Sequence, residues 1–413
     1  MGSTVVEKII AAHSGAESVK PGVIVWMTID VRTARDFGGA NVVKRFEKEY
    51  PGDKVDDPSK TFFTFDCNAP ANTSGYADNQ MICRRFAQEQ GIKVYDVDSG
   101  IGSHIAIEDG LAYPGITYVG TDSHLNILGA VGAFGQGMGD ADIAYAFRHG
   151  RTWFEVPATM RIAFAGLPRP PVSAKDVTLK VLREIGSSGA LGMAVEFYGS
   201  LIDRMKLHSR ITLASMATEM GAVTALLPPN EDILRYCRHA AKKGDIGGVY
   251  ADPDAAYARE LTIDISRLRL QIACPPSPSN VVDVAEVRGR KIDSVFIGSC
   301  TGGRFEDFVT AAAILRGNRV AQGVMLRLQP ATRQVYGQLI DAGLIKTFYE
   351  AGGIFINPGC GGCAQGQVGM TGKGEVQLST SNRNFAGKQG SGETYLCSAY
   401  VAAKSALAGM IVE

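Results

Sequence analysis

Short apolar runs rich in β-branched residues alternate with amphipathic stretches along most of this chain. Four of the runs predict buried strands that end in glycine or polar residues: 22–30, 115–122, 160–166 and 294–300. Four of the stretches predict helices, the third of them with Asn230 as its N-cap: 40–50, 174–186, 230–244 and 332–352. This alternation is typical of α/β folds, whose functional residues lie in loops at the carboxyl ends of parallel strands.

The length of the chain predicts more than one domain. At 413 residues it exceeds an ordinary domain, so we expect two or three α/β units. The proline-rich run at 274–280 predicts a linker, because clustered prolines stop both helices and sheets. A softer boundary falls at 155–158.

Charge and composition exclude several classes of protein. Lys and Arg (42) balance Asp and Glu (42), so no net charge attracts nucleic acid or an acidic membrane. No apolar run approaches the ~18–20 residues of a membrane-spanning helix, and the first residues do not form a secretory signal. The eight cysteines are therefore expected to be reduced thiols or metal ligands. We expect a cytoplasmic protein that binds neither nucleic acid nor membranes.

Three of the cysteines lie in glycine-rich segments after predicted strands. Cys360 and Cys363 form a CxxC pair in NPGCGGCAQG, and Cys300 lies in GSCTGGR. The pair alone fits a redox dithiol, half of a zinc site or part of an iron–sulfur cluster. Three cysteines on strand-end loops suit a [4Fe–4S] cluster with one iron that no thiolate binds. The helix expected after Cys300 would direct its amino end at the thiolate. Spacing alone leaves zinc, redox and structural thiols open.

Other polar residues have an ordinary structural reading beside a chemical one. Asp122 and His124, in TDSH, form a proton-handling pair or a strand-end cap. His104, in GIGSHI, is by default a histidine of a surface loop. Glu219, in ASMATEMGA, lies on a helical stretch typical of a solvated face. The residues alone leave these alternatives open.

Four motifs in this order resemble those of the aconitase superfamily, and in particular of 3-isopropylmalate dehydratase large subunits: VGTDSH, GSCTGGR, PGCGGCAQG and STSNRNFAGKQG. The resemblance extends from about residue 5 to the C-terminus. It implies three α/β domains around a [4Fe–4S] cluster, at 1–157, 158–276 and 277–413. The family's mobile fourth domain is absent from this chain and is expected on a small partner subunit, in a heterodimer or heterotetramer.

The resemblance also implies a role for each matching residue. Catalytic roles are implied for Asp66, Cys67, His104, Asp122, His124 and Glu219. Substrate contacts are implied for Ser123, Arg383 and Lys388, cluster-facing side chains for Ser215 and Asn382, and cluster ligation for Cys300, Cys360 and Cys363. Arginine suits carboxylate binding because its planar fork pairs with both oxygens.

Four positions depart from the family's pattern. Cys67 follows Asp66 where the family usually has histidine, and a thiol is less suited to protonate a departing hydroxyl at neutral pH. Lys388 replaces an arginine, and an ammonium cannot form a bidentate fork. Ser215 and Gly302 each replace an asparagine. Because all three cysteines are kept, we expect an active enzyme with an altered substrate or leaving-group arrangement.

These observations favour a hydro-lyase or isomerase acting on a malate-type hydroxy dicarboxylate. Other enzyme readings are a dedicated hydratase such as 2,3-dimethylmalate dehydratase, or an isomerase for a phosphorus-containing malate analogue. A more remote reading, an RNA-binding iron–sulfur protein, is disfavoured by the zero net charge and the lack of a basic run. A dithiol redox protein would leave Cys300 and TDSH without a role.

Overall fold

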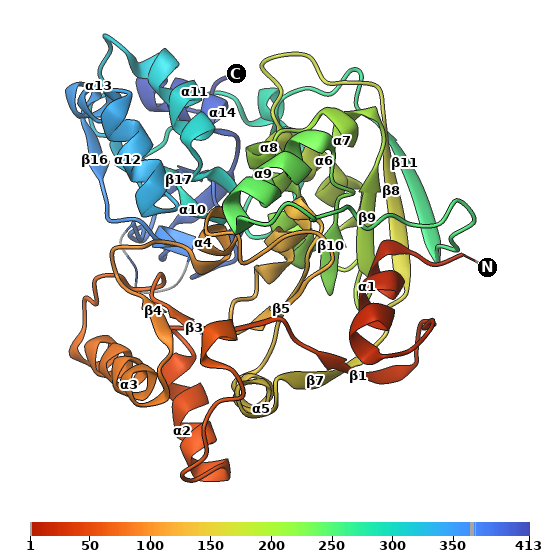
Figure 1. Ribbon diagram of the computed structural model, residues 1–413. Coiled ribbons are helices and arrows are strands. Elements are labelled where there is room, and N and C mark those ends of the chain that lie inside the picture. The colour runs from red at the N-terminus through yellow and green to blue at the C-terminus, as the bar shows by residue number, and fades with distance from the viewer. Residues whose placement is uncertain (1, 364–366, 368) are drawn as a thin grey trace.

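A computed structural model of the chain describes residues 2–363, 367 and 369–413, with only the backbone described at Cys363. The described residues form three predominantly parallel sheets covered by helices, and a separate two-stranded ribbon (Figure 1). This confirms the α/β class that the alternating pattern predicts. None of the helices in the described part combines the length and apolarity needed to cross a membrane.

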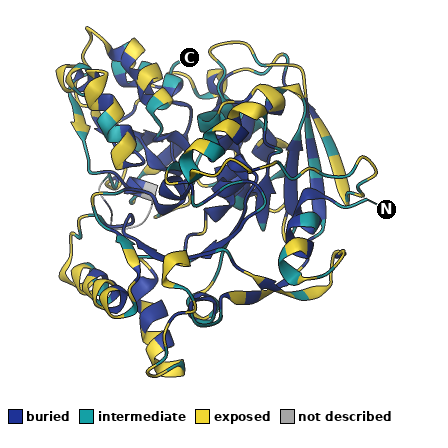
Figure 2. Cartoon of the chain, in the orientation of Figure 1, coloured by how far each residue is buried: buried dark blue, intermediate teal, exposed yellow. Residues whose placement is uncertain are grey.

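The first sheet has five parallel strands in the order β4-β3-β2-β5-β6. Their bounds are β2 Val31–Arg35, β3 Thr61–Thr64, β4 Lys93–Tyr95, β5 Thr117–Gly120 and β6 Phe134–Gly137. Helices α2 (Gly39–Glu49), α3 (Ser74–Gln90) and α5 (Asp140–His149) pack together on this sheet. Phe46, Phe63, Phe86 and Phe147 are buried in the core between these helices and the sheet, and Figure 2 colours the inner strands of the sheet as buried. Helix α4 (Gly102–Glu108) and η2 (Leu125–Val131) belong to a second core, shared with the next sheet.

The second sheet has four parallel strands in the order β10-β9-β8-β11. Their bounds are β8 Thr159–Ala165, β9 Ala194–Tyr198, β10 Thr224–Leu226 and β11 Arg259–Asp264. Its helices are α6 (Ala174–Ile185), α7 (Ser200–Arg204), α8 (Leu207–Ser215) and α9 (Glu231–Ala241), with η3 (Met216–Met220) after α8. The cap predicted for α9 is confirmed, since the Asn230 side chain accepts a 3.0 Å hydrogen bond from the Ile233 amide.

The third sheet has seven strands in the order β13-β12-β18-β17-β14-β15-β16. Their bounds are β12 Gln271–Ala273, β13 Val281–Asp283, β14 Ser294–Ile297, β15 Met325–Leu328, β16 Gly353–Phe355, β17 Val376–Ser379 and β18 Glu393–Leu396. The strands from β14 to β18 are parallel, whereas β12 pairs antiparallel with both β13 and β18. Helices α11 (Phe305–Leu315), α12 (Arg333–Asp341), α13 (Leu344–Ala351) and α14 (Ala399–Ala408) complete this layer.

Local structure differs from the sequence prediction at four places. The run 22–30, predicted as a buried strand, forms a strand at Ile24–Thr28 of which only Met27 is buried. The proline-rich run 274–280 joins the antiparallel strands β12 and β13 within one sheet and is not an interdomain linker. The helix predicted at 332–352 is divided by Gly343, whose φ of 68° is left-handed and ends the first helical segment. The helix predicted after Cys300 is present as α11, but it starts only at Phe305, and Cys300 itself lies in the short α10 (Ser299–Gly302).

One helix and one two-stranded ribbon lie outside the three sheets. Helix α1 (Val5–Ser14) has a capping box formed by Thr4 and Glu7, and it packs against strand β1 (Ile24–Thr28). Strand β1 pairs antiparallel with β7 (Arg151–Glu155) to form the separate ribbon. The division at 157 and 276 stays a prediction, although β12 of the third sheet already begins at Gln271.

Candidate active site

Two sheets present the predicted site residues from the carboxyl ends of their strands. In the first sheet, Asp66 and Asp122 follow the strands β3 and β5, on either side of β2. In the third sheet, Cys300 follows β14, and the segment 380–383 follows the neighbouring strand β17. A 2.9 Å hydrogen bond from the Cys360 amide to the Asp66 carbonyl joins the two loop sets. The expectation for an α/β fold, that chemistry gathers at strand ends, therefore describes how these residues come together.

Arg35 lies at the centre of this junction, and the sequence prediction missed it. Its Nε donates to Asp66 Oδ1, its Nη1 to Asp122 Oδ1 and its Nη2 to Cys360 Sγ, each at 2.8 Å. The side chain is only 13% exposed. Burial by itself would lower the pKa of Arg35, but Asp122 and Asp66 raise it well above its ordinary value. Arg35 therefore holds two predicted catalytic carboxylates and one predicted cluster ligand with a single permanent charge.

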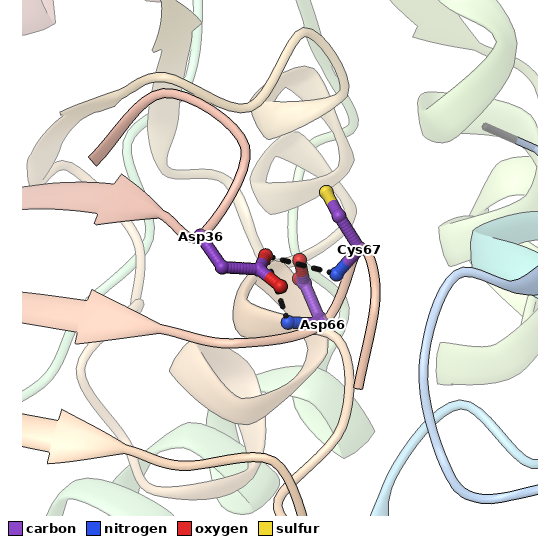
Figure 3. Close-up of side chains that lie close together, drawn as sticks. All are labelled: Asp36, Asp66 and Cys67. Atoms are coloured by element: carbon purple, nitrogen blue, oxygen red, sulfur yellow. Dashed lines mark hydrogen bonds between the residues drawn. The ribbon is translucent and has the colours of Figure 1, made fainter. Parts of the chain in front are cut away.

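Asp36 anchors the loop that carries Asp66 and Cys67 (Figure 3). Its carboxylate accepts hydrogen bonds from the amides of Asp66, Cys67 and Asn68 at 3.3, 3.0 and 3.1 Å. The side chain of Gln80 donates to it as well, at 3.2 Å. Asp36, Asp66 and Cys67 lie close enough together to suggest a cation site. Because the oxygens of Asp36 already accept four hydrogen bonds, we assign it to holding the loop.

His124, Glu219 and Arg383 form a buried ionic group. His124 Nε2 donates to Glu219 Oε1 at 3.0 Å, and Arg383 Nε donates to the same oxygen at 2.6 Å. Burial by itself would raise the pKa of Glu219, but the opposing effect of His124 and Arg383 is larger and leaves the pKa below its ordinary value. The carboxyl is therefore ionised at neutral pH. The other oxygen, Oε2, is buried and has no hydrogen-bond partner among the described residues. Such an oxygen is expected to face a ligand, because an unpaired buried acceptor costs free energy.

Asp66 and Asp122 differ in their protonation. Burial raises the pKa of Asp66 to about 6, although Arg35 opposes the shift. Burial also raises the pKa of Asp122, but Arg35 and His124 reverse the shift and leave it below its ordinary value. One carboxyl can therefore carry a proton near neutral pH, while its neighbour across Arg35 stays ionised. Two carboxyl groups with separated pKa values are a common arrangement in acid–base sites.

His104 makes protein contacts with both ring nitrogens. Arg304 Nη1 donates to His104 Nδ1 at 3.3 Å, which leaves the proton on Nε2. Nε2 donates to the carbonyl of Cys300 at 3.1 Å. Burial and the Arg304 charge lower the pKa of His104 to about 3, so the ring is neutral. Arg304 is itself held by Glu108 at 2.6 Å. This buried chain fixes the orientation of the loop that carries Cys300.

The Cys300 loop is also held from the side of the third sheet. Cys300 Sγ lies 3.5 Å from Asn382 Oδ1, and the Asn382 amide donates to Ser215 Oγ at 2.9 Å. Ser299 adopts a left-handed backbone conformation with a φ of 70°. Left-handed backbone at a non-glycine residue is unfavourable and is concentrated at functional turns. Ser215 and Asn382, which are both predicted to face the cluster, thus lie together beside Cys300.

Lys175 is a second buried cation behind these loops. Its Nζ donates to the carbonyls of Thr380 and Ser381 at 3.1 and 2.7 Å, and to Thr301 Oγ1 at 3.3 Å. Burial lowers the pKa of Lys175 to about 8. It lines a cavity of about 390 Å³ between α6 and α14, which no predicted site residue lines. Lys175 therefore joins the second and third sheets from behind the site.

The described residues fit an iron–sulfur cluster in their chemistry. Cys300 and Cys360 are buried thiols in the loops that follow β14 and β16, and thiolates are the ligands that iron–sulfur clusters take. Within the described ranges, Oε2 of Glu219 has no partner and leaves an acceptor for a ligand. The side chain of Cys363 lies outside the described residues, so the third predicted ligand is not placed.

Two predicted substrate contacts lie nearer the surface. Ser123 is exposed, and its hydroxyl is 3.5 Å from His124 Nδ1. Lys388 is half-buried, and its amide donates to the Phe385 carbonyl at 3.0 Å. Phe385 itself is 44% exposed. Ser123 and, in part, Lys388 are therefore accessible from solvent.

Cys67 is expected to contribute little to proton transfer. Burial and the neighbouring Cys360 thiol raise the pKa of Cys67 well above its ordinary value, so it stays a neutral thiol. Cys67→Ala should therefore lower kcat less than about tenfold, whereas loss of a general acid costs about 10²–10⁴-fold. The measurement is kcat between pH 6 and 9 at matched iron content. A loss above about 10²-fold would identify the thiol as the acid.

Comparison with known proteins agrees with this geometry. The family model described as "Aconitase family (aconitate hydratase)" matches residues 7–289 and 285–409. The chain is 45% identical to a probable 3-isopropylmalate dehydratase large subunit of Methanothermobacter thermautotrophicus, over 100% of this chain and 98% of that protein. It is 44% identical to 3-isopropylmalate dehydratase large subunit 1 of Methanopyrus kandleri, over 100% and 99%. It is 40% identical to a probable methanogen homoaconitase large subunit of M. thermautotrophicus, over 98% and 96%.

A solved structure supports the fold. Aconitase X of Thermococcus kodakaraensis, in its holo form, superposes with a TM-score of 0.55 at 14% sequence identity, covering 97% of this chain and 95% of that one. The strand-end cysteines, the His124–Glu219–Arg383 group and the full-length matches lead to one conclusion. The chain belongs to the aconitase family and is a hydro-lyase.

Proposed function

We propose that this chain is the large subunit of an enzyme that dehydrates and rehydrates a malate-type hydroxy dicarboxylate, with 3-isopropylmalate as the first substrate to test. The observation that carries the proposal is the meeting of two loop sets at one junction. Cys360 contacts Arg35 there, and Arg35 in turn holds the carboxylates of Asp66 and Asp122. The similarity to 3-isopropylmalate dehydratase large subunits along the whole chain supports the substrate class.

The cofactor that we propose is a [4Fe–4S] cluster held by Cys300, Cys360 and Cys363, with one iron that no protein thiolate binds. When bound, it supplies a Lewis acid that polarises the hydroxyl of the substrate. His104 and Asn382 orient Cys300, through its carbonyl and its thiol. Arg35 orients Cys360.

The remaining residues bind the substrate and handle protons. Arg383 lies beside Glu219 and is suited to hold a carboxylate of the substrate, and we propose Lys388 as a second substrate contact. The Oε2 of Glu219, which has no partner among the described residues, is placed to accept a hydrogen bond from the substrate hydroxyl and so to orient it. Asp66, whose pKa burial raises to about 6, is the group best suited to pass a proton to the departing hydroxide.

Dehydration also needs a base that removes the neighbouring C–H proton. We propose that a small subunit supplies this base on a mobile domain, which closes over the cleft and excludes water. The names of the relatives as large subunits support a two-chain enzyme.

The test is to assay the anaerobically purified chain with and without its small-subunit partner. We expect visible absorbance and about three to four irons per chain, with turnover of 3-isopropylmalate only when both chains are present. Cys300→Ser should lose most of the iron and all of the activity. Cys83→Ser, in a buried thiol of α3, is the matched control and should keep both. Full iron content in Cys300→Ser would exclude the cluster, and full turnover by the isolated chain would exclude the shared site.

A homoaconitase-type reaction is the second candidate. The 40% identity to a probable methanogen homoaconitase large subunit favours it. A panel of malate-type acids, with the alkyl substituent replaced by carboxyalkyl chains, separates the two. A higher kcat/KM for the tricarboxylic substrates would establish the homoaconitase reading, and a higher value for 3-isopropylmalate the first one.

A further inference from the structure

The ribbon formed by β1 and β7 exposes both tryptophans of the chain on one face. Trp26 and Trp153 are direct cross-strand neighbours, and each is 50% exposed. Ile24, on the same face of β1, is 64% exposed. Figure 2 colours much of this ribbon as exposed, in contrast to the buried inner strands of the three sheets. Large apolar side chains gathered on an exposed face mark interaction surfaces.

The ribbon holds these side chains in fixed positions. Its inner face, with Met27 and Phe154, is buried in the core of the first sheet. On the outer face, the ring of Tyr145 lies 5.6 Å from that of Trp26, and the Arg151 guanidinium lies 5.2 Å above the Trp26 ring. Rigid aromatic side chains lose little conformational entropy on binding, which is why tryptophan dominates interface energetics.

The position of the ribbon separates it from the active site. Only Ile29 and Asp30 separate β1 from β2. The Asp30 amide donates to the carbonyl of Thr117 at the start of β5. The ribbon therefore lies at the amino-terminal edge of the first sheet, whereas Asp36, Asp66 and Asp122 lie at its carboxyl edge (Figure 1). A partner bound to the ribbon leaves the cleft open to a small subunit.

The charges on the ribbon show which partner fits. Arg151 and Glu155 are exposed at opposite ends of β7, with Trp153 midway between them. No ion pair among the described ranges 2–363, 367 and 369–413 includes Arg151 or Glu155. A second β7 in the reversed direction would place its Glu155 against Arg151, and its Arg151 against Glu155, around a central pair of tryptophans. The surface is thus complementary to itself.

We propose that this ribbon is the interface of a homodimer of this chain, with a twofold axis beside the Trp26–Trp153 pair and perpendicular to the strands. The tryptophans and Ile24 form the apolar centre, and two Arg151–Glu155 pairs flank it. In an assembly with small subunits, this contact would join two large subunits back to back and leave both clefts accessible. The inference does not depend on which hydroxy acid the enzyme uses.

The test is the self-association of the full-length chain, measured by sedimentation velocity over a range of micromolar concentrations. We expect a dimer for the wild type, and at least a hundredfold weaker association for the double variant Trp26→Ser, Trp153→Ser. Arg151→Glu and Glu155→Arg should each weaken the dimer by about tenfold or more, because each places like charges together. The double variant Arg151→Glu, Glu155→Arg should restore it, since the swapped charges pair again across the axis.

Leu191→Ser is the matched control, because Leu191 is 73% exposed on another part of the surface. It should leave association unchanged, and near-ultraviolet circular dichroism should show that each variant is folded. A wild-type monomer at all concentrations would overturn the proposal, as would a double charge variant that associates no better than the single ones. A tryptophan variant that stays dimeric but loses its small subunit would assign the ribbon to that subunit and would also overturn it.

Discussion

Replacing Arg35 by methionine should destabilise the folded chain by about 3–5 kcal/mol, because it leaves two buried carboxylates without their cation. The three 2.8 Å hydrogen bonds of Arg35 reach Asp66, Asp122 and Cys360, which belong to three different strand-end loops. Methionine keeps the length of the side chain but donates no hydrogen bond. The measurement is urea unfolding of the cluster-free chain, where the loss does not depend on metal content.

The same substitution should lower kcat/KM by at least about 10²-fold in the reconstituted enzyme, because Asp66, Asp122 and Cys360 lose the group that positions them. At about 1.4 kcal/mol for each factor of ten, this is a loss of about 2.8 kcal/mol of transition-state stabilisation. Arg35→Lys should be intermediate, because an ammonium keeps the charge but cannot span three partners. Arg45→Met is the control: Arg45 on α2 is 46% exposed and pairs with Glu49 at 3.1 Å, so it should cost less than about 1 kcal/mol. If Arg35→Met unfolded like the wild type, Arg35 would not hold the three loops together.

Glu219→Gln should lower kcat by about 10²–10³-fold with little loss of iron, the range expected when one preorganised hydrogen-bonding group of an active site is altered. Glutamine keeps the shape of the side chain, but its amide has only one acceptor oxygen, whereas the carboxylate has two. Oε1 is occupied by His124 and Arg383, and Oε2 has no partner among the described residues. The amide also removes the negative charge that pairs with Arg383. The measurement is kcat and KM at matched iron content.

Glu196→Gln separates catalysis from stability in this comparison. Glu196 is buried on β9, where its Oε2 accepts from Tyr198 at 2.6 Å and from Tyr257 at 3.2 Å. Burial raises its pKa, as it does for other carboxyls with no cation beside them. Its replacement should lower the free energy of unfolding and leave kcat unchanged. Equal losses of kcat in the two variants would mean that Glu219 acts only by supporting the fold.

Local sequence determined the class of fold and the chemistry of the motifs. β-branched runs alternating with amphipathic stretches specify strands and helices through contacts close in sequence, and the cap at Asn230 formed as predicted. The cysteine motifs and TDSH follow strands, so their position at sheet edges also follows from local order. Gly343 shows the limit of this reasoning, because its left-handed conformation divides a stretch whose periodicity continues across it.

The tertiary structure decided which of these residues meet. Arg35 contacts Cys360 across 325 positions of sequence, and this depends on β2 lying between β3 and β5 and on the first sheet facing the third. Strand order and the packing of sheets are set by long-range contacts, which no local pattern encodes. The same holds for Trp26 and Trp153. Only their pairing across the ribbon shows that they share an exposed face, because a tryptophan taken alone is usually expected to be largely buried.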